Sequence, residues 1–411
     1  MHTREISVRV QRLSGGTAMK AIYIPVGATG HILSSLPMVG ELVARGVETI
    51  YFAPESCRAQ VELSGAHFHP IPAVAARGKS VECDQDFIAG LPLVFLGEAD
   101  GVISEILPVA QAFDPDIVIA DELALAGRLV AAALHKPLVM VFTSFAPCER
   151  FSICRYWPAY TDDHPARAQA REIAQRFTRK YGVKPLDIYE IFEGLGDLNI
   201  STLIRAFQPA GDSFGDNFLF AGAQIGPRAE AGSWQPPQDG KPLLYTSLGS
   251  LFNNWPEFYQ MLFPVVRELD LHVLCALGKA LTPQDLSDIP ANVTLLPFAP
   301  QLDVLAHADY FITHAGTGSA MEALYYGVPC VCIPQMDEQI LTARQMVRLG
   351  VASTSMVRAE VTEDSLRDAL LRLMHEPHYR ERARAMSRQM RETGGSACAA
   401  NAIIDFIKAK T

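Results

Sequence analysis

The sequence predicts an α/β protein built from two doubly wound, Rossmann-like domains. Its 411 residues exceed an ordinary single domain and suit two domains of about 200 residues each. Both halves contain a short apolar strand that ends in a glycine-containing turn and opens into a helical pattern, at 21–45 and at 310–326. A polar, Pro/Gly-rich run at 226–240 separates these halves and is the best linker in the chain.

Composition and charge exclude several broad classes of protein. Hydrophobic residues make up 49% and charged residues 19% of the chain, which provides a large core and argues against disorder. The formal net charge of −10 argues against nucleic acid or an anionic membrane as the main partner. No apolar run is long enough to span a bilayer, and the N-terminus lacks a signal-peptide layout. The eight cysteines form no C-x-x-C pair and no zinc-like cluster, so we expect a cytoplasmic protein without a metal.

The chain begins with a polar stretch before its first clear strand. We expect residues 1–18 to form a loose extension, with the alternative that Ile6, Val8 and Val10 belong to an extra edge strand. The first domain then spans 19–225 and opens with strand 21–26, helix 33–45 and strand 48–52. This opening lacks the G-x-G-x-x-G spacing and the acidic residue that would hold a ribose, so hydride chemistry is disfavoured.

His31 follows the first strand, next to Gly30, at the carboxyl edge of the predicted sheet. A lone histidine in such a turn is often an incidental helix cap. Imidazole is also suited to withdrawing a proton from a hydroxyl group near neutral pH. The residues alone leave both roles open.

A carboxylate that could serve His31 ends another strand of the same domain. Strand 117–120 is followed by Asp121 and Glu122, ahead of a helix at 124–134. An acid at this position lies on the same sheet edge as His31 and can orient its ring and stabilise the imidazolium. Asp121 is equally suited to cap the helix, and Glu122 is the fallback partner.

Two stretches, 73–107 and 142–195, are predicted to be irregular and are rich in aromatic residues. We interpret them as the walls of an apolar pocket for an acceptor molecule, with ordinary core packing as the alternative for each ring. The candidate acceptor-binding residues are Phe87, Phe95, Phe145, Phe151 and Trp157.

The second domain is predicted to span 241–395. Its first strand, 243–247, leads into a turn with Ser247, Gly249 and Ser250, where the glycine lets the backbone approach a ligand. Both serines also suit a plain turn. The further elements expected are helix 257–268, strands 272–277 and 293–296, and helices at 363–375, 379–391 and 397–408.

The most informative stretch is 298–339. Strand 310–313 ends at His314 and a turn with Gly316 and Gly318, which opens into helix 320–326. The first N–H groups of a helix have no partner within the helix, and its dipole favours an anion, so this turn can hold a phosphate. Turns of this kind also occur in doubly wound proteins generally.

A second strand, 328–334, ends in the polar cluster 335–339. Two successive strand ends therefore present polar groups at one edge of the sheet, where open α/β sheets bind ligands. The first strand end provides hydrogen-bond donors for phosphate, and the second provides amides and carboxylates that can bind hydroxyl groups. This order suits a nucleotide-sugar.

The stretch resembles the donor-binding signature of UDP-sugar-dependent glycosyltransferases with the GT-B fold, in which two Rossmann-like domains face each other across a cleft. The matching residues are Phe298-Ala299-Pro300-Gln301, Val304-Leu305, His314, Gly316, Ser319, Glu322, Gly327-Val328-Pro329, Pro334 and Glu338-Gln339. The Pro-Gln-Met-x-Glu-Gln ending is most similar to the bacterial macrolide and flavonoid glucosyltransferase branch. By analogy with this fold, residues 396–411 form a helix that returns to the first domain.

The resemblance implies an inverting sugar transfer, with His31 as general base and Asp121 as its partner. It also implies that Phe298 stacks on uracil, with core packing as the alternative, and that Glu322 accepts the ribose hydroxyls. His314 and the helix N-terminus would stabilise the leaving diphosphate without a metal. The implied donor-binding residues are Gly30, Ser247, Gly249, Ser250, Phe298, Gln301, His314, Gly316, Thr317, Gly318, Ser319, Glu322, Asp337, Glu338 and Gln339.

Thr317-Gly318 replaces a Trp-Asn pair of the plant enzymes, and Asp337 precedes Glu338, so either carboxylate can meet the sugar. The final glutamine favours glucose. The expected function is transfer of glucose from UDP-glucose to a hydroxyl of a polyketide, macrolide or phenolic acceptor, by a monomer or homodimer that needs no cofactor.

The alternatives are a TDP-deoxysugar-dependent antibiotic glycosyltransferase, a UDP-sugar 2-epimerase and an inactive auxiliary protein. An auxiliary protein would be expected to lose the Gly-His and Glu-Gln pairs, and both are present.

Overall fold

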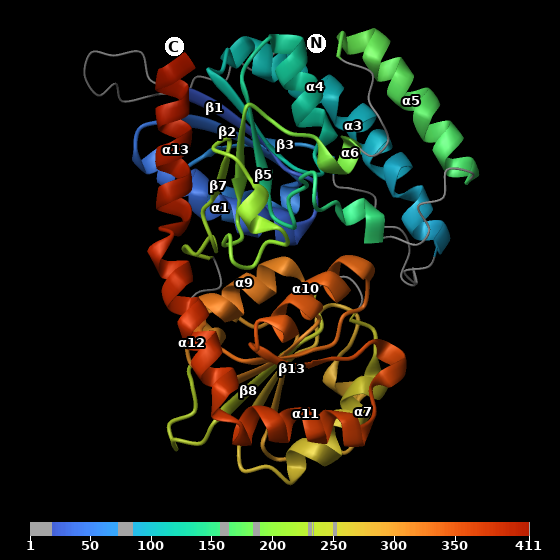
Figure 1. Cartoon of the computed structure of the whole chain (residues 1–411), viewed down its shortest axis with the longest axis vertical. Helices are drawn as coiled ribbons and strands as arrows, with labels where there is room; N and C mark the ends of the chain where they lie inside the picture. Colours follow the sequence, from blue (N-terminus) through green and yellow to red (C-terminus); the bar gives the residue numbers. More distant parts are fainter. Residues whose placement is uncertain are drawn as a thin grey trace.

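The computed structural model describes residues 19–72, 85–156, 164–183, 190–228, 232, 234–249 and 253–410. The described residues form two lobes, each built on a parallel β-sheet (Figure 1). This arrangement confirms the predicted pair of Rossmann-like domains.

The sheet of the first lobe has the order β3-β2-β1-β4-β5-β6-β7. Its strands are β1 (Lys20–Ile24), β2 (Glu48–Ala53), β3 (His67–Pro70), β4 (Ile117–Asp121), β5 (Leu138–Phe142), β6 (Leu198–Ser201) and β7 (Phe218–Phe220). The strand order reverses between β1 and β4. The carboxyl ends of these two strands therefore flank the point where a doubly wound sheet binds its ligand.

The sheet of the second lobe has the order β10-β9-β8-β11-β12-β13. Its strands are β8 (Leu243–Ser247), β9 (His272–Ala276), β10 (Val293–Leu296), β11 (Tyr310–Thr313), β12 (Cys330–Cys332) and β13 (Ala352–Ser355). The reversal here lies between β8 and β11. The turns that follow these strands contain Gly249 and His314.

Helices cover both faces of each sheet, as parallel strands require. In the first lobe they are α1 (Thr29–Ala44), α2 (Arg58–Leu63), α3 (Gln85–Phe113), α4 (Leu125–Leu134), α5 (Pro165–Tyr181) and α6 (Glu190–Glu193). After the linker come α7 (Pro256–Arg267), α8 (Gln301–Leu305), α9 (Thr317–Tyr326), α10 (Asp337–Arg348), α11 (Glu363–His375), α12 (Pro377–Glu392) and α13 (Gly395–Lys410). Short 3₁₀ helices lie at Glu55–Cys57, Ile153–Tyr156, Gly211–Ser213, Pro283–Asp285 and Arg358–Glu360.

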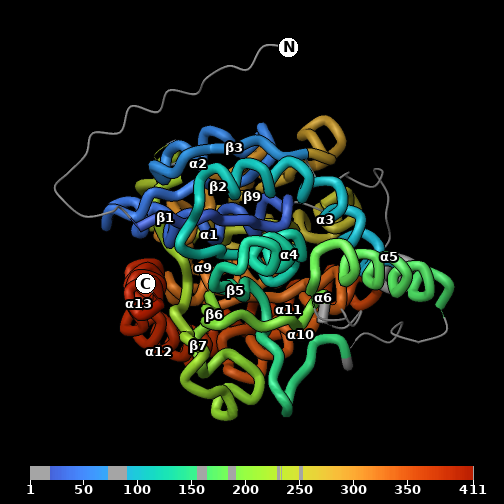
Figure 2. The backbone as a smooth tube through the Cα atoms, turned by 90° about the horizontal axis from the view of Figure 1, so that it is seen from above, coloured from blue at the N-terminus to red at the C-terminus, as the bar shows by residue number. Residues whose placement is uncertain are grey.

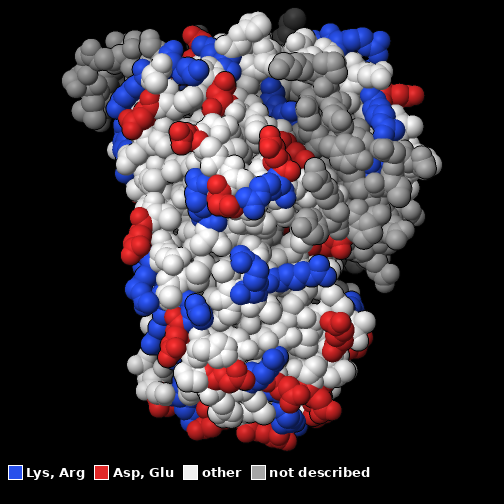
Figure 3. Space-filling view, in the orientation of Figure 1, with Lys and Arg blue, Asp and Glu red and all other residues white. Residues whose placement is uncertain are grey.

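Within the described parts of the chain, none of these helices combines the length and apolarity that crossing a membrane requires. Acidic and basic side chains are interspersed on the face shown in Figure 3. The net charge of −10 is therefore not gathered into one continuous acidic field on this face.

The last helix, α13, packs against α1 of the first lobe (Figures 1 and 2). Its buried side chains Ala399, Ile403 and Ile407 share one apolar cluster with Ile32 and Val39 of α1. Since α12 packs on α9 of the second lobe, the C-terminal helices connect the two lobes.

The two stretches that we predicted to be irregular contain long helices. Helix α3 continues through Pro92 and Pro108 because its buried face, which includes Leu96, Ile103 and Ile106, is held by the core. Helix α5 carries ordinary boundary signals that we overlooked: it begins with Pro165, and its C-cap, Gly182, has a φ of 66°.

Candidate active site

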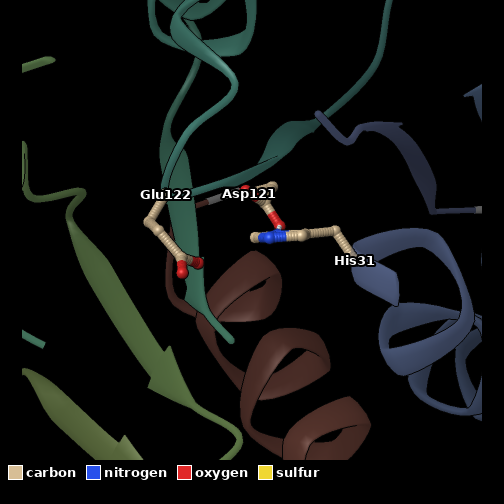
Figure 4. Close-up of side chains that lie close together, drawn as sticks. All are labelled: His31, Asp121 and Glu122. Carbon is tan, nitrogen blue, oxygen red and sulfur yellow. Dashed lines mark hydrogen bonds and ion pairs between the residues drawn. The ribbon is translucent and has the colours of Figure 1, made fainter. Parts of the chain in front are cut away.

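His31 and Asp121 are brought together at the carboxyl edge of the first sheet. Helix α1 begins at Thr29, earlier than predicted, so His31 lies in its first turn. Asp121 is the last residue of β4. The ring nitrogen Nδ1 lies 2.7 Å from the carboxylate oxygen Oδ2 (Figure 4). The His31 side chain is 24% exposed, whereas that of Asp121 is fully buried. The other oxygen of Asp121 accepts the N–H of Leu123 at 2.9 Å, so Asp121 both orders the next turn and orients the ring.

Glu122, the fallback partner, does not bond to the His31 ring. Its carboxylate lies near the ring (Figure 4) but accepts the N–H groups of Thr143 and Ser144 at 2.7 Å and 3.0 Å. The hydroxyl of Thr143 lies 3.0 Å from Nδ1 of His31 and 3.2 Å from Glu122, so it links the two groups. Burial first, and the charge of Asp121 second, raise the pKa of Glu122 to about 7.

His31, Asp121 and Glu122 each offer one potential metal-ligand atom within 4.8 Å of the others. Both carboxylates, however, already accept backbone N–H groups, and Asp121 also accepts Nδ1 of His31. The arrangement matches a histidine–carboxylate pair for proton transfer better than a metal centre.

The charge environment of His31 favours its protonated form. Burial alone would lower the pKa of the ring, but the charge and hydrogen bond of Asp121 outweigh it, and the pKa rises to about 9. Glu122 and Glu338 add to this rise. Glu338 belongs to the first turn of α10, in the second lobe.

Glu98 is a further acidic group near the pair that sequence reasoning missed. It lies on α3, accepts the N–H of Gly27 at 3.0 Å, and its Oε2 atom is buried without a partner among the described residues. Burial raises the pKa of Glu98 to about 7, and the charge of Asp121 adds to the rise. The only sequence signal was the helical period of α3, which we interpreted as irregular structure.

In the second lobe the ring of His314 lies between two glycines. A Cβ atom would lie 2.6 Å from its Nε2 atom at Gly249 and 2.5 Å at Gly316, so neither position has room for a side chain. Gly249 also has a φ of 83°, which disfavours other residues. Burial lowers the pKa of His314 to about 4, and its Nδ1 atom has no partner among the described residues. The ring is therefore neutral at pH 7.

The N-terminus of α9 offers unpaired donors beside this ring. The helix begins at Thr317, earlier than predicted, and its first backbone bond runs from the N–H of Ala320 to Gly316. The N–H groups of Thr317, Gly318 and Ser319 find no acceptor in the described part of the chain. Gly318 is exposed, with open space where a side chain would be. An anion can therefore approach these donors.

Gln301, Ser319 and Glu322 form one hydrogen-bonded group next to the helix N-terminus. The Nε2 atom of Gln301 donates to Ser319 at 3.1 Å and to Glu322 at 2.6 Å. Arg228 of the linker also pairs with Glu322, a contact that the sequence did not predict. Phe298 is 65% exposed, so its core alternative is wrong, and its ring is free to serve as a stacking platform.

Asp337, Glu338 and Gln339 occupy the first turn of α10. Glu338 accepts the hydroxyl of Thr317, and burial raises the pKa of its carboxyl group. Gln339 is 6% exposed and accepts the N–H of Gln335 at 2.9 Å. Burial also raises the pKa of Asp337.

The remaining candidates are placed as follows. Ser247 is buried, and its hydroxyl accepts the N–H of Gly249 at 3.4 Å. Gly30 lies in the first turn of α1, beside His31. Ser250 and Trp157 lie outside the described residues, as does the side chain of Phe87.

Phe145 and Phe151 are 2% and 4% exposed and pack edge-on against each other. Phe145 also stacks on Phe207, and Phe95 packs against Phe192. These contacts are those of core residues, and the acceptor-binding role of the aromatic rings stays a prediction.

Comparisons with known proteins cover nearly the whole chain. Residues 260–404 match the family described as "Erythromycin biosynthesis protein CIII-like, C-terminal domain". The chain is 32% identical to the NDP-glycosyltransferase YjiC of Bacillus subtilis (strain 168), over 94% of this chain and 96% of the relative. It is 30% identical to the demethyllactenocin mycarosyltransferase of Streptomyces fradiae, over 92% and 84% of the two chains.

Solved structures show the same extent of similarity. The calicheamicin glycosyltransferase CalG4 superposes with a TM-score of 0.83 at 30% identity, over 95% of this chain and 98% of CalG4. The glycosyltransferase of kitacinnamycin superposes with a TM-score of 0.84 at 28% identity, over 95% and 99% of the two chains. The similarity covers both lobes and confirms the GT-B fold.

Proposed function

The chain belongs to the family of NDP-glycosyltransferases, and from this premise we propose that it transfers glucose from UDP-glucose to a hydroxyl of an apolar natural-product acceptor, with inversion at the anomeric carbon. The observation that carries the proposal is the pairing of two half-sites. His31 and Asp121 lie at the switch point of the first sheet. His314 and the N-terminus of α9 lie at the switch point of the second sheet.

His31 is the general base of the proposed reaction. With Nδ1 held by Asp121, the Nε2 atom is left to take the proton of the acceptor hydroxyl. The acceptor oxygen then forms a bond to the anomeric carbon from the side opposite the diphosphate. The bond from that carbon to the diphosphate oxygen breaks, and UDP leaves with the electron pair. Asp121 stabilises the imidazolium that results.

The leaving diphosphate is bound by backbone donors rather than by a cation. The unpaired N–H groups of Thr317, Gly318 and Ser319 and the dipole of α9 all favour negative charge at this position. With its pKa near 4, His314 acts as a neutral N–H donor. These donors support a transfer that does not depend on a metal.

Three residues support uridine and glucose as the parts of the donor. Glu322 can accept both hydroxyls of a ribose, and exposed Phe298 can stack on the base. Gln339 supports glucose through the resemblance of the Glu-Gln ending. A TDP-deoxysugar is the second candidate, because the relatives include a mycarosyltransferase. The relatives and structures named for oleandomycin and calicheamicin support a hydrophobic natural product as acceptor.

The test is His31→Ala, assayed with UDP-glucose and a panel of phenolic and macrolide acceptors, with product detected by mass spectrometry. We expect turnover to fall by about 10²- to 10⁴-fold, the usual contribution of a general base. The affinity for UDP, measured by titration calorimetry with and without EDTA, should stay at the wild-type value.

His375→Ala, a substitution of an exposed histidine on α11, is the matched control and should behave as wild type. Wild-type turnover in His31→Ala would refute the base assignment. Tighter binding of TDP than of UDP would favour the second candidate.

A further inference from the structure

Arg228 forms an ion pair with Glu322, the residue that the proposed function assigns to binding the ribose. Its guanidinium donates through Nη2 to Oε1 of Glu322, and the two side chains are 11% and 10% exposed. The other oxygen of Glu322 accepts Nε2 of Gln301 at 2.6 Å. Both oxygens of Glu322 are thus bonded and shielded from solvent in the free protein.

Arg228 also lines a small cavity that contains a second carboxylate, that of Asp303. The cavity has a volume of about 130 Å³ and lies between the linker and helices α8 and α9. It is lined by Ile225, Gly226, Pro227, Arg228, Pro300, Leu302, Asp303 and Tyr326. This volume has room for several water molecules, and therefore for a guanidinium group that turns from Glu322 toward Asp303.

The segment that carries Arg228 also contacts helix α1 of the first lobe. Gly226, two residues before Arg228, packs so closely on Pro37 that a Cβ atom at this glycine would lie 2.8 Å from the proline side chain. Pro37 belongs to α1, the helix that carries His31. The backbone two residues before Arg228 is therefore packed against α1.

Building on the proposed function, we propose that Arg228 is a displaceable partner of Glu322 that sets the affinity of the site for the nucleotide. The ribose hydroxyls replace the guanidinium on Glu322, and Arg228 turns to Asp303. When UDP leaves, Arg228 returns to Glu322 and keeps that carboxylate from remaining buried without a partner. Arg228 is thus a positioning residue that weakens nucleotide binding and favours release of the product.

The test compares binding of UDP and of pyrophosphate, which lacks a ribose, by titration calorimetry. In Arg228→Met we expect the Kd for UDP to fall about fivefold, because the ribose no longer has to displace a cation from Glu322. The Kd for pyrophosphate should not change. If Arg228 acted only in folding, its substitution would change the Kd values for both ligands or for neither.

Arg380→Met is the matched control. Arg380 pairs with Asp309 at 3.1 Å in the same lobe, with side chains that are 35% and 30% exposed, and its loss should leave both Kd values unchanged. Unchanged or weaker UDP binding by Arg228→Met would overturn the proposal. If Arg228→Met does not fold, Asp303→Asn provides the second measurement. It removes the alternative partner and should weaken UDP binding, and wild-type UDP affinity would contradict the displacement.

Glu322→Gln separates failure of this proposal from failure of the proposed function. If Glu322 binds the ribose, Glu322→Gln weakens UDP binding strongly in both the wild-type and the Arg228→Met background. Wild-type UDP affinity in Glu322→Gln would refute the ribose assignment itself. A strong loss of UDP affinity in Glu322→Gln, without a gain of UDP affinity in Arg228→Met, would refute only the proposed displacement of Arg228.

Discussion

His31 and His314 show how neighbouring residues give one side chain two different chemistries. Carboxylates near His31 raise its pKa to about 9, whereas the ring of His314 lies between two glycines and desolvation lowers its pKa to about 4. At neutral pH the first ring binds a proton in the free protein and the second does not. The base of the proposed reaction must therefore lose a proton before it can act.

This requirement predicts the pH dependence of the reaction. Only neutral His31 can take the proton of the acceptor hydroxyl, so kcat/KM should rise with pH, reach half of its plateau value near pH 9 and level off above that pH. In Asp121→Asn the loss of the carboxylate charge lowers the pKa of His31, and the rising limb should move to lower pH. Initial rates from pH 6 to 10 test both statements, and an identical limb in the two proteins would contradict them.

The same shift links His31 to stability. The pKa of His31 in the folded protein lies above its unfolded value of about 6.5. The interaction between His31 and Asp121 therefore contributes its full stabilisation below about pH 6.5. The contribution is lost as the pH rises through about 9.

The sequence allowed us to place the candidate residues that lie at strand ends, but not those that tertiary packing brings to the site. His31, Asp121 and His314 follow or end recognisable strands, so their place on the sheet edge could be derived. Arg228 pairs with a residue 94 positions away, and Glu98 with one 71 positions away. No local pattern signals such contacts, because they depend on how the linker and α3 pack.

At the scale of elements, the turns after β8 and β11 are built around the ring of His314. Gly249 and Gly316 come from different turns, and both approach the same nitrogen of the ring. The N-terminus of α9, where we propose that the diphosphate binds, is therefore packed against a side chain of the turn before it. A helix pattern in the sequence does not reveal this contact.

Gly316→Ala tests this arrangement. The φ of Gly316 is −59°, which alanine adopts freely, so the effect comes from the 2.5 Å contact between the new methyl group and the ring. We expect a loss of about 1–3 kcal/mol in the free energy of unfolding, as for overpacked cores. UDP binding should weaken about tenfold, because displacement of the ring disturbs the donors of α9.

Gly101→Ala is the control for this substitution. Gly101 lies in α3 with nothing within 4 Å of a Cβ atom, so alanine there should leave the free energy of unfolding unchanged or slightly higher. If urea titration shows the same stability for both variants, the ring does not fill the space between the glycines in solution.

Elements with a strong periodic pattern could be predicted, and those with conflicting signals could not. The strand at 243–247 and the helix at 363–375 have the bounds that the sequence predicts. Helix α3 contains two prolines, which locally favour a break in the helix. The helix continues because its buried face packs into the core of the first lobe.

At the scale of the whole molecule, the chain connects its two lobes twice, once through the linker after β7 and once through α12 and α13. The linker could be recognised by its composition. The position of α13 could be expected only by analogy with related folds, because an amphipathic helix does not specify which surface it covers. Its apolar face lies on α1, the helix that carries His31 in its first turn.

Ile403→Ala tests whether α13 completes the core of the first lobe. Ile403 is fully buried, and removing its side chain should lower the free energy of unfolding by about 2–5 kcal/mol through lost burial and a residual cavity. Asp405, on the same helix, has a side chain that is 77% exposed, so Asp405→Ala should change stability by less than about 0.5 kcal/mol. Urea unfolding measured on both variants distinguishes the two cases. Equal stability would mean that α13 does not pack on α1 in solution, and the end of the chain would then contribute nothing to the position of His31.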